Sequence, residues 1–528
     1  MAFDVVIRSG WVFDGLGGEP VRGDLGVVGG RIEALGPCVE GEAARTIDAS
    51  GLAVAPGFID IHTHGDVYPL LCPDAPARLH DGVTTEMVGN CGESPFPQSR
   101  AMLAARADSV ERYGIEVDWA TLDDFARRQD AAGSGINRCS LVGHGNVRAA
   151  VMGEGDGAPT GEQLDGMCRE VEAAMEAGAV GLSTGLVYAP GMYAEPREVE
   201  ALCRVVARYG GLYASHIRNE GETMEEAVEE FADAGRHTGV RLQLSHVKMA
   251  GEPNWGKAQP LARRLEAIRA EGVDLACDRY PYTAGATSLS AFLPGWAREG
   301  GRERMLERVA GGETRRRLLV ELGAEEMQAT WRVLVIAGAG CERWQQAEGR
   351  GLVDVAAEVG RPPAEVALEV LTASGGRASI VQFSMCERNV AMWLRLPFVA
   401  VASDSSSRGA EGPTASGKPH PRAYGTSARF LGRYVREQGL MGLAEGVRRL
   451  TSLPASRIGL SRRGVLRPGA CADVAVFDPQ RIIDRATYEH PQQYSVGVRA
   501  VLVNGVVALA DGELTGARAG RFLRRGEE

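Results

Sequence analysis

The sequence predicts an α/β protein: a (β/α)8 TIM-like barrel with a small β-sandwich built from both termini and a helical insertion late in the barrel. Short apolar runs alternate with helical patterns through the middle of the chain, which is typical of parallel β/α units. Both ends consist instead of short strand-like runs separated by glycine-rich turns. The chain has 528 residues, so it can bury a large core and exceeds the roughly 250 residues of a plain barrel.

The two ends of the chain supply the strands of the predicted sandwich. Strand patterns cover Asp4–Arg8, Trp11–Asp14, Leu25–Val28 and Arg31–Leu35 at one end, and Ala472–Phe477 and Val498–Gly505 at the other. Asp-Pro and Asn-Gly turns accompany the last two runs. We assign residues 1–56 and 456–528 to the sandwich, and residues 57–455 to the barrel.

Eight apolar runs between these ends predict the barrel strands. They are Gly57–His64, Thr84–Gly89, Cys139–Gly143, Ala179–Thr184, Leu212–His216, Leu242–His246, Val273–Cys277 and Val399–Ser403. Helical patterns such as Gly161–Ala177, Glu195–Ala207 and Met224–Thr238 fall between them. Before the eighth strand, about residues 286–345 form the predicted insertion, with an Arg/Glu-rich helix over Arg302–Leu322. This insertion could form a lid over the barrel mouth or be a peripheral addition to the barrel, and the sequence leaves both alternatives open.

Composition excludes several classes of protein. The net charge of −11 is spread along the chain, and no basic patch indicates a nucleic-acid partner. No apolar run is long enough to cross a bilayer, and the N-terminus lacks the pattern of a signal peptide. The ten cysteines are scattered without a C-x-x-C motif, which favours a reducing compartment. We therefore expect a cytoplasmic protein that binds neither membrane nor nucleic acid; the oligomeric state stays open.

Two histidines close the first barrel strand. His62 and His64 are two residues apart, so in a strand both imidazoles project from one face, and the polar turn Gly65-Asp66 follows at once. The carboxyl ends of the strands carry the chemistry in β/α barrels. Two converging imidazoles there make half of a metal site.

Four more residues of metal-binding type end other predicted strands or open the loops beyond them. They are Cys91, His216, His246 and Asp404. All six side chains are expected to point into one barrel mouth. A set of four imidazoles, one thiolate and one carboxylate suits zinc best. Any one of these residues is more often structural; six of them at the ends of five strands are hard to explain as packing.

With these motifs the chain resembles the amidohydrolase superfamily, and within it the N-acyl-D-amino-acid deacylases, or D-aminoacylases. The resemblance covers nearly the whole chain. The matching segments are Gly57–Asp66, Gly89–Gly92, Ser215–Glu220, Ser245–Lys248, Tyr280–Gly285, Ser403-Asp404 and His420–Arg422.

The resemblance implies how the metal is held. Many binuclear amidohydrolases bridge two metals with a carboxylated lysine on the fourth strand, but the run Val180–Tyr188 contains no lysine. Cys91 is the substitute that the D-aminoacylase pattern implies. That pattern implies one tight zinc held by Cys91, His216 and His246. It also implies a second, weaker position at His62 and His64 with Asp404 nearby, whose occupancy stays open.

The resemblance also implies the reaction, which is hydrolysis of N-acyl-D-amino acids to a carboxylate and a free D-amino acid. Metal-activated water attacks the amide and Asp404 serves as the general base. Arg422 and Tyr280 match the positions that bind the substrate α-carboxylate. Lys248, two residues after His246, can share that face. The preference for D substrates comes from the resemblance alone.

Several points depart from the family pattern or stay open. Glu93 follows the cysteine motif where relatives often have phenylalanine, and the stretch after Asp404 is longer than expected. Arg298 and Arg302 are candidate partners for an acidic substrate side chain, whereas a hydrophobic or broad specificity is the simpler expectation. His144, at the end of the third strand, suits a structural or a functional role equally. Arg218 and Glu220 can support the metal ligand His216.

Two alternative functions remain. An amidohydrolase that acts on cyclic amides, as hydantoinases and dihydropyrimidinases do, would keep the barrel and the metal. The missing lysine on the fourth strand argues against it. A non-catalytic scaffold with the same fold would have lost metal ligands, whereas the sequence retains every expected one.

Overall fold

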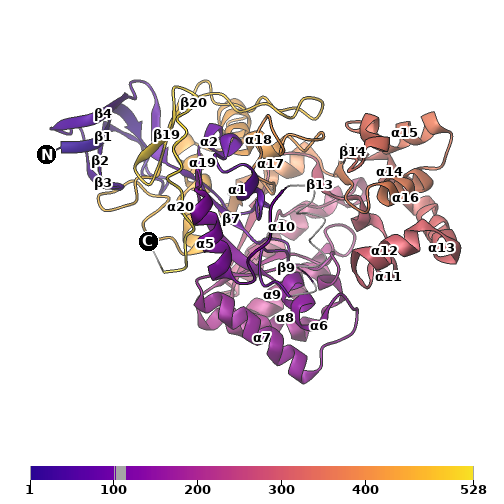
Figure 1. Ribbon diagram of the computed structural model, residues 1–528. Helices are drawn as coiled ribbons and strands as arrows, with labels where there is room; N and C mark the ends of the chain where they lie inside the picture. The colour runs from indigo at the N-terminus through magenta and orange to yellow at the C-terminus, as the bar shows by residue number, and fades with distance from the viewer. Residues whose placement is uncertain (1, 100–101, 103–113, 527–528) are drawn as a thin grey trace.

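A parallel β-barrel lies between a sheet made from both termini and a helical lobe (Figure 1). The computed structural model describes residues 2–99, 102 and 114–526. The barrel strands are hydrogen-bonded in the order β16-β12-β11-β10-β9-β8-β7-β6, so all eight predicted strands are confirmed. Their bounds are β6 (Phe58–Asp60), β7 (Val83–Val88), β8 (Asn137–Gly143), β9 (Gly181–Gly185), β10 (Leu212–His216), β11 (Arg241–Leu244), β12 (Leu275–Arg279) and β16 (Val399–Val401).

Helices surround this barrel, and three of them correspond to the predicted helical runs. Those three are α7 (Gly161–Glu176), α8 (Pro196–Arg208) and α9 (Met224–Thr238). The others are α1 (Tyr68–Leu71), α2 (Pro76–His80), α5 (Leu122–Ala132), α6 (His144–Met152), α10 (Ala258–Ala270), α17 (Glu387–Arg395), α18 (Arg422–Arg429), α19 (Leu443–Leu450) and α20 (Ser452–Ile458). Local signals set their ends: Thr160 and Gln163 form a capping box at the start of α7, and α9 stops at Gly239, which has a left-handed φ of 71°. None of the described helices is long and apolar enough to span a membrane.

Apolar side chains fill the interior of the barrel. Ile59, Met87, Leu141, Leu212 and Ala400 belong to one buried cluster, and each comes from a different barrel strand. The barrel interior is therefore a packed core rather than a pore.

The barrel closes without a ladder of hydrogen bonds between its first and last strands, β6 and β16. Loops beyond these strands make the closing contacts. The Asp404 N–H donates to the His62 carbonyl at 2.8 Å, and the His64 N–H donates to the Ser405 carbonyl at 3.1 Å. Thr63 and Ser405 form an isolated parallel bridge. The seam is thus joined by the residues that the sequence marks as functional.

The two termini share one nine-stranded sheet. Its strands are β1 (Ala2–Val12), β2 (Val21–Val28), β3 (Arg31–Gly36), β4 (Glu42–Asp48), β5 (Ala53–Pro56), β17 (Val474–Phe477), β18 (Val498–Val503), β19 (Val506–Ala510) and β20 (Glu513–Leu514). β5 pairs with β1 on one side and with β17 on the other, and Leu25 and Val474 belong to one core cluster. The two strands predicted within residues 4–14 are one strand, β1, with an irregular register between Ile7 and Gly10.

A helical lobe with its own small sheet separates β12 from β16, far from the terminal sheet (Figure 1). It contains β13 (Gly285–Ser288), α11 (Gly295–Arg298), α12 (Gly301–Ala310), α13 (Gly312–Leu322), α14 (Glu325–Arg332), β14 (Leu334–Gly338), α15 (Leu352–Val359), α16 (Pro363–Ala373) and β15 (Ser379–Gln382). The prediction of a single helix over Arg302–Leu322 is wrong. The helix is interrupted at Gly311-Gly312, where Gly312 has a φ of 73°.

The lobe is also longer than the predicted insertion of about residues 286–345. β15 pairs with both β13 and β14, which ties residues 285–382 into one unit. Leu318, Trp331, Ile336 and Leu368 share its buried core. The helices α15 and α16 followed by a strand repeat the strand-and-helix pattern of the barrel, so periodicity alone does not separate them from it.

Candidate metal centre

The structure brings all six predicted metal-binding residues together at the carboxyl end of the barrel. His62 and His64 follow β6, Cys91 follows β7, and Asp404 follows β16. His216 is the last residue of β10, and His246 lies just past β11. The expected placement of His62 and His64 within the first strand is wrong, since β6 ends at Asp60. The two rings still converge, with centroids 5.5 Å apart.

The ligand atoms form two groups that share Cys91. One group contains Cys91, His216 and His246; the other contains His62, His64, Cys91 and Asp404, and in each group the atoms lie within 4.8 Å of one another. The Cys91 Sγ atom is 3.4 Å from His62 Nε2 and 3.5 Å from His246 Nε2. The Asp404 Oδ1 atom is 3.0 Å from His64 Nε2. The thiolate therefore occupies a bridging position.

These distances fit a zinc ion. Tetrahedral coordination with Zn–S near 2.3 Å and Zn–N near 2.0 Å places sulfur and nitrogen ligands about 3.5 Å apart. The Nδ1 atom of His216 is buried without a hydrogen-bond partner among the described residues. A buried nitrogen of this kind is costly unless something binds it. The centre thus offers both the spacing and a free ligand atom.

Three of the six residues adopt backbone conformations that side chains rarely accept. Cys91, His246 and Asp404 have φ values of 53°, 37° and 51°. Non-glycine residues in this left-handed region cost free energy and cluster at functional sites. Each lies two or three residues beyond the end of a strand.

Charge pairing dominates the electrostatics of the centre. Burial by itself would raise the pKa of the Cys91 thiol, but His62 and His246 outweigh it and hold that pKa well below its usual range. Burial would likewise raise the pKa of Asp404, but Arg422 and His62 hold it well below its usual range. The pairing therefore favours the anionic form of both groups, which is the form that metal ligands and a general base use.

Two carboxylates, Asp278 and Glu220, contact the histidines. The sequence interpretation did not include Asp278 and assigned Glu220 only to His216. The Asp278 Oδ1 atom is 3.0 Å from His62 Nδ1 and accepts the His246 N–H at 2.7 Å. Asp278 is a charged residue within the apolar strand β12, and this feature of the sequence could have indicated its role. The Glu220 Oε1 atom is 2.9 Å from His246 Nδ1. Such contacts fix which ring nitrogen faces a metal.

The predicted substrate-binding residues differ in their surroundings. Arg422 Nη1 lies 2.9 Å from Asp404 Oδ2, and its guanidinium stacks 4.5 Å from the centre of the Tyr280 ring. Lys248 is 7% exposed, and its ammonium is paired with Glu220. Both cations thus have a carboxylate partner, and the Lys248 Nζ atom also lies 2.8 Å from His246 Nδ1.

Two further candidates lie away from the centre. His144 is fully buried, with Nε2 2.7 Å from Glu198 Oε1, and the same carboxylate binds Arg148. Arg218 pairs with Glu230 at 2.8 Å rather than with His216. The described contacts of both residues are those of structural groups.

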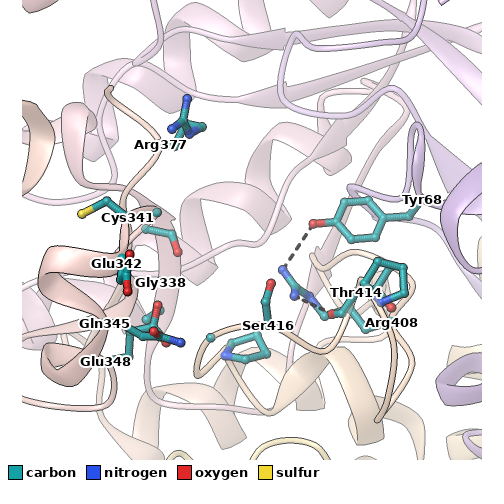
Figure 2. A pocket seen from close by; sticks show the side chains of 16 residues that line it. Tyr68, Gly338, Cys341, Glu342, Gln345, Glu348, Arg377, Arg408, Thr414 and Ser416 are labelled. Carbon is teal, nitrogen blue, oxygen red and sulfur yellow. Dashed lines mark hydrogen bonds between the residues drawn. The ribbon is translucent and has the colours of Figure 1, made fainter. Parts of the chain in front are cut away.

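Two cavities open at the barrel mouth. The larger, of about 1120 Å³, is the metal chamber: it contains His64, Cys91 and Asp404 and reaches α12 of the lobe. Its charged lining residues are Glu93, Glu154, Arg298, Arg302, Glu303, Arg408 and Arg422. The smaller, of about 440 Å³, is the outer cavity, which lies between Tyr68, the loop of residues 408–419 and the lobe (Figure 2).

Comparison with known proteins gives consistent matches along the chain. A profile of the amidohydrolase family matches residues 45–378 and 399–509. The chain is 36% identical over 523 residues to a D-aminoacylase of Alcaligenes xylosoxydans xylosoxydans, covering 99% of this chain and 98% of that protein. It is 37% identical over 527 residues to an N-acyl-D-glutamate deacylase of the same organism, covering 99% and 96%.

A solved structure matches over the same extent. It is the N-acyl-D-glutamate deacylase of Bordetella bronchiseptica in complex with zinc and a phosphonate inhibitor. The TM-score is 0.83 and the identity is 37%, over 99% of this chain and 100% of the other.

Proposed function

The chain belongs to the amidohydrolase family and, within it, to the D-aminoacylases; from this premise we propose that it hydrolyses the amide bond of N-acyl-D-amino acids in a zinc-dependent reaction. The products are a carboxylate and a free D-amino acid. One observation carries the proposal: Cys91 lies within reach of both groups of ligand atoms, and Asp404 stands beside it with Arg422 on its other oxygen.

We assign the tight zinc to Cys91, His216 and His246, and a weaker position to His62, His64 and Asp404. The distances among these atoms and the free His216 Nδ1 support the assignment. When bound, zinc lowers the pKa of a coordinated water toward neutrality and polarises the amide carbonyl. Because Cys91 already lies between two imidazoles as a thiolate, no carboxylated lysine is needed as a bridge.

Asp404 moves the proton. Its Oδ1 atom faces the His62 and His64 imidazoles at 3.4 Å and 3.0 Å, which places this oxygen among the ligand atoms. We propose that Asp404 takes a proton from the attacking water and delivers it to the leaving nitrogen. Its low pKa keeps the carboxylate ionised in the substrate-free protein.

Arg422 holds the substrate α-carboxylate. Its planar guanidinium suits a carboxylate, and the Tyr280 ring beneath it fixes its plane. In the substrate-free protein this guanidinium pairs with Asp404, so a bound α-carboxylate competes for it. We propose Tyr280 as a support for Arg422 and Lys248 as a second cation on the same side. Lys248 has to turn away from Glu220 to reach the substrate.

The test is hydrolysis of paired N-acetyl-D- and N-acetyl-L-amino acids by enzyme of measured metal content, over methionine, leucine, phenylalanine, glutamate and aspartate. Strong turnover of the D series by zinc-loaded enzyme is expected. The preferred side chain then shows whether the charged lining of the chamber selects an acidic substrate. If the enzyme hydrolyses hydantoins or dihydropyrimidines and cleaves neither the D nor the L series of N-acetyl-amino acids, its function is hydrolysis of cyclic amides instead. No turnover of any amide by zinc-loaded protein would support a non-catalytic role.

A further inference from the structure

We propose that Arg408 and the outer cavity form a second substrate subsite, which binds a carboxylate at the far end of the amide substrate. The inference rests on the proposed amide hydrolysis and narrows its substrate class to amides with a distal acid group. The acid can belong to the acyl chain, as in a dicarboxylic acyl group, or to the side chain of the amino acid. The chemistry of recognition is the same in both cases.

Arg408 stands where the two cavities meet. It lines both the metal chamber and the outer cavity, as do Ala337, Ser379 and Pro419. It lies four positions after Asp404, so the two Cα atoms are at most about 14 Å apart. A substrate held at the metal centre by its amide can therefore extend one arm to Arg408 without leaving the cavities.

The Arg408 guanidinium has no carboxylate partner among the described residues. It donates to the Thr414 carbonyl at 3.0 Å and to the Tyr68 hydroxyl at 3.3 Å, both neutral groups. The side chain is half-buried. Figure 2 shows these contacts, with the guanidinium between the Tyr68 hydroxyl and Ser416. A guanidinium has five N–H donors in a fixed fork, so donors remain for a ligand.

Three other buried or half-buried arginines at this end of the barrel have counterions, whereas Arg298 and Arg279 donate to the Val187 and Tyr282 carbonyls. Arg422 pairs with Asp404, Arg78 pairs with Asp60 and Glu86, and Arg429 pairs with Asp484. Withdrawing a cation from water without such a partner is unfavourable. Arg408 is held by two neutral groups and, unlike Arg298, lines both cavities. This is the arrangement of a binding residue rather than of a structural ion pair.

The opposite wall of the outer cavity carries charges of both signs. Glu342 and Glu348 come from the lobe and line only the outer cavity, not the metal chamber (Figure 2). The Glu348 carboxylate accepts the Ala339 N–H at 2.9 Å and so is fixed in place. A ligand carboxylate that reaches past Arg408 approaches these two acids and also the Arg377 guanidinium, which lines the same cavity. The charge of this wall is therefore mixed, and the length of the ligand decides which of these groups its carboxylate meets.

The loop that carries Arg408 lies between Asp404 and the Pro419–Arg422 segment. It includes Ser405–Gly412, the stretch for which the sequence interpretation expects a greater length than the family pattern. Arg408, Thr414, Ser416 and Gly417 from this loop form one wall of the outer cavity. This loop, next to Asp404, thus supplies both a wall of the outer cavity and its Arg408 cation.

The experiment compares acid substrates with their carboxamides. The acyl arm uses N-glutaryl-D-leucine against its glutaramoyl counterpart, and the side-chain arm uses N-acetyl-D-glutamate against N-acetyl-D-glutamine. Each ratio of kcat/KM is measured in the native enzyme and in Arg408→Met, Arg408→Lys and a control, Arg304→Met. Arg304 lies on α12 with its side chain 66% exposed and lines neither cavity.

We expect Arg408→Met to lower the acid-to-amide ratio in at least one arm by about 10- to 100-fold, the loss of a charge-assisted hydrogen bond. Turnover of the carboxamides should change little. Arg408→Lys should retain part of the preference, and Arg304→Met should retain all of it. The arm that responds identifies the source of the carboxylate. A series of malonyl, succinyl, glutaryl and adipoyl substrates should show an optimum at the length that places the carboxylate at Arg408.

Binding of free glutarate, measured by calorimetry, separates this inference from the proposed function. Arg408→Met should weaken that binding even if no amide is hydrolysed; in that case the proposed function fails and the subsite stands. If amides are hydrolysed but neither ratio changes in Arg408→Met, and glutarate binding is also unchanged, the subsite does not exist.

Discussion

A buried ion network beneath the metal centre gives the sharpest test of what holds this barrel together. The Glu86 carboxylate, fully buried on β7, accepts from Arg78 Nε at 3.0 Å and from Arg138 Nε at 2.6 Å. It also accepts the Ser407 hydroxyl at 2.9 Å. Burial would raise its pKa, but Arg138 and Arg78 outweigh burial and lower it, so the group is an anion. The perturbation is Glu86→Gln, which keeps the shape and removes the charge.

The size of the expected loss of stability follows from the donors and acceptors that glutamine offers to the two guanidinium groups. A glutamine amide offers one oxygen and one NH2 group, so only one guanidinium finds an acceptor and the other meets a donor. Arg78 keeps Asp60 at 3.1 Å, whereas the remaining described partner of Arg138 is the Ser134 hydroxyl. Arg138 therefore becomes an uncompensated buried charge. Breaking a buried pair in this way costs about 3–5 kcal/mol of unfolding free energy.

The assay is urea unfolding followed by tryptophan fluorescence, with Glu172→Gln as the control. Glu172 makes the same kind of pair with Arg208 at 3.0 Å, but both side chains are exposed, at 38% and 61%. The control should lose at most about 1 kcal/mol. A loss in Glu86→Gln no larger than in Glu172→Gln would refute the reasoning, because the buried network would then contribute nothing beyond a surface pair. Turnover should also fall, since Arg78 and Ser407 hold the loop after Asp404.

Three further predictions concern the centre and its surroundings. Asp404→Asn should retain zinc, measured by elemental analysis, and lose turnover by about 10²- to 10⁴-fold; near-native turnover would remove Asp404 as the base. Cys91→Ala should lose the tightly bound zinc, and an unchanged metal content would exclude Cys91 as a ligand. Bonds from His144 and Arg148 outweigh burial and lower the Glu198 pKa, so this group stabilises the fold above its unfolded pKa of about 4.3 and less as pH falls below it. The stability difference between native protein and Glu198→Gln should thus be largest near pH 7 and shrink in acid; a difference independent of pH would contradict this.

Local patterns were sufficient to predict the barrel. Each strand is a short apolar run bounded by polar or glycine residues, and α9 begins and ends at its predicted residues because Gly239 terminates it. The terminal sheet was harder. β4 is mostly exposed and polar, so it carries no apolar alternation, and β1 pairs with it only once the chain has folded. The lobe misled the prediction because its helices and strands use the same periods as the barrel.

The candidate centre was predictable to the level of residue identity and not to the level of contacts. Six ligand-type residues at strand ends were visible in the sequence, and the structure brings them together. The bond from Asp278 to His62 joins residues 216 positions apart, so no local pattern could indicate it. The pairing of Lys248 with Glu220 likewise depends on how two loops approach each other. The spacing of residues along one strand predicts the face to which their side chains point. Which residues pair with one another depends on how the loops at the carboxyl end of the barrel come together.

The sheet shared by the termini has a consequence for how this chain is made. β5 ends at Pro56 and its partner β17 begins at Val474, so more than 400 residues are synthesised between them. At roughly 5–20 residues per second, the ribosome needs on the order of 20–80 s to supply the missing strand. During that time the edge of β5 that will receive β17 is unpaired in the nascent chain. The N-terminal strands therefore cannot complete their sheet until β17 has been synthesised. A chaperone that shields exposed strand edges during translation would increase the yield of folded enzyme.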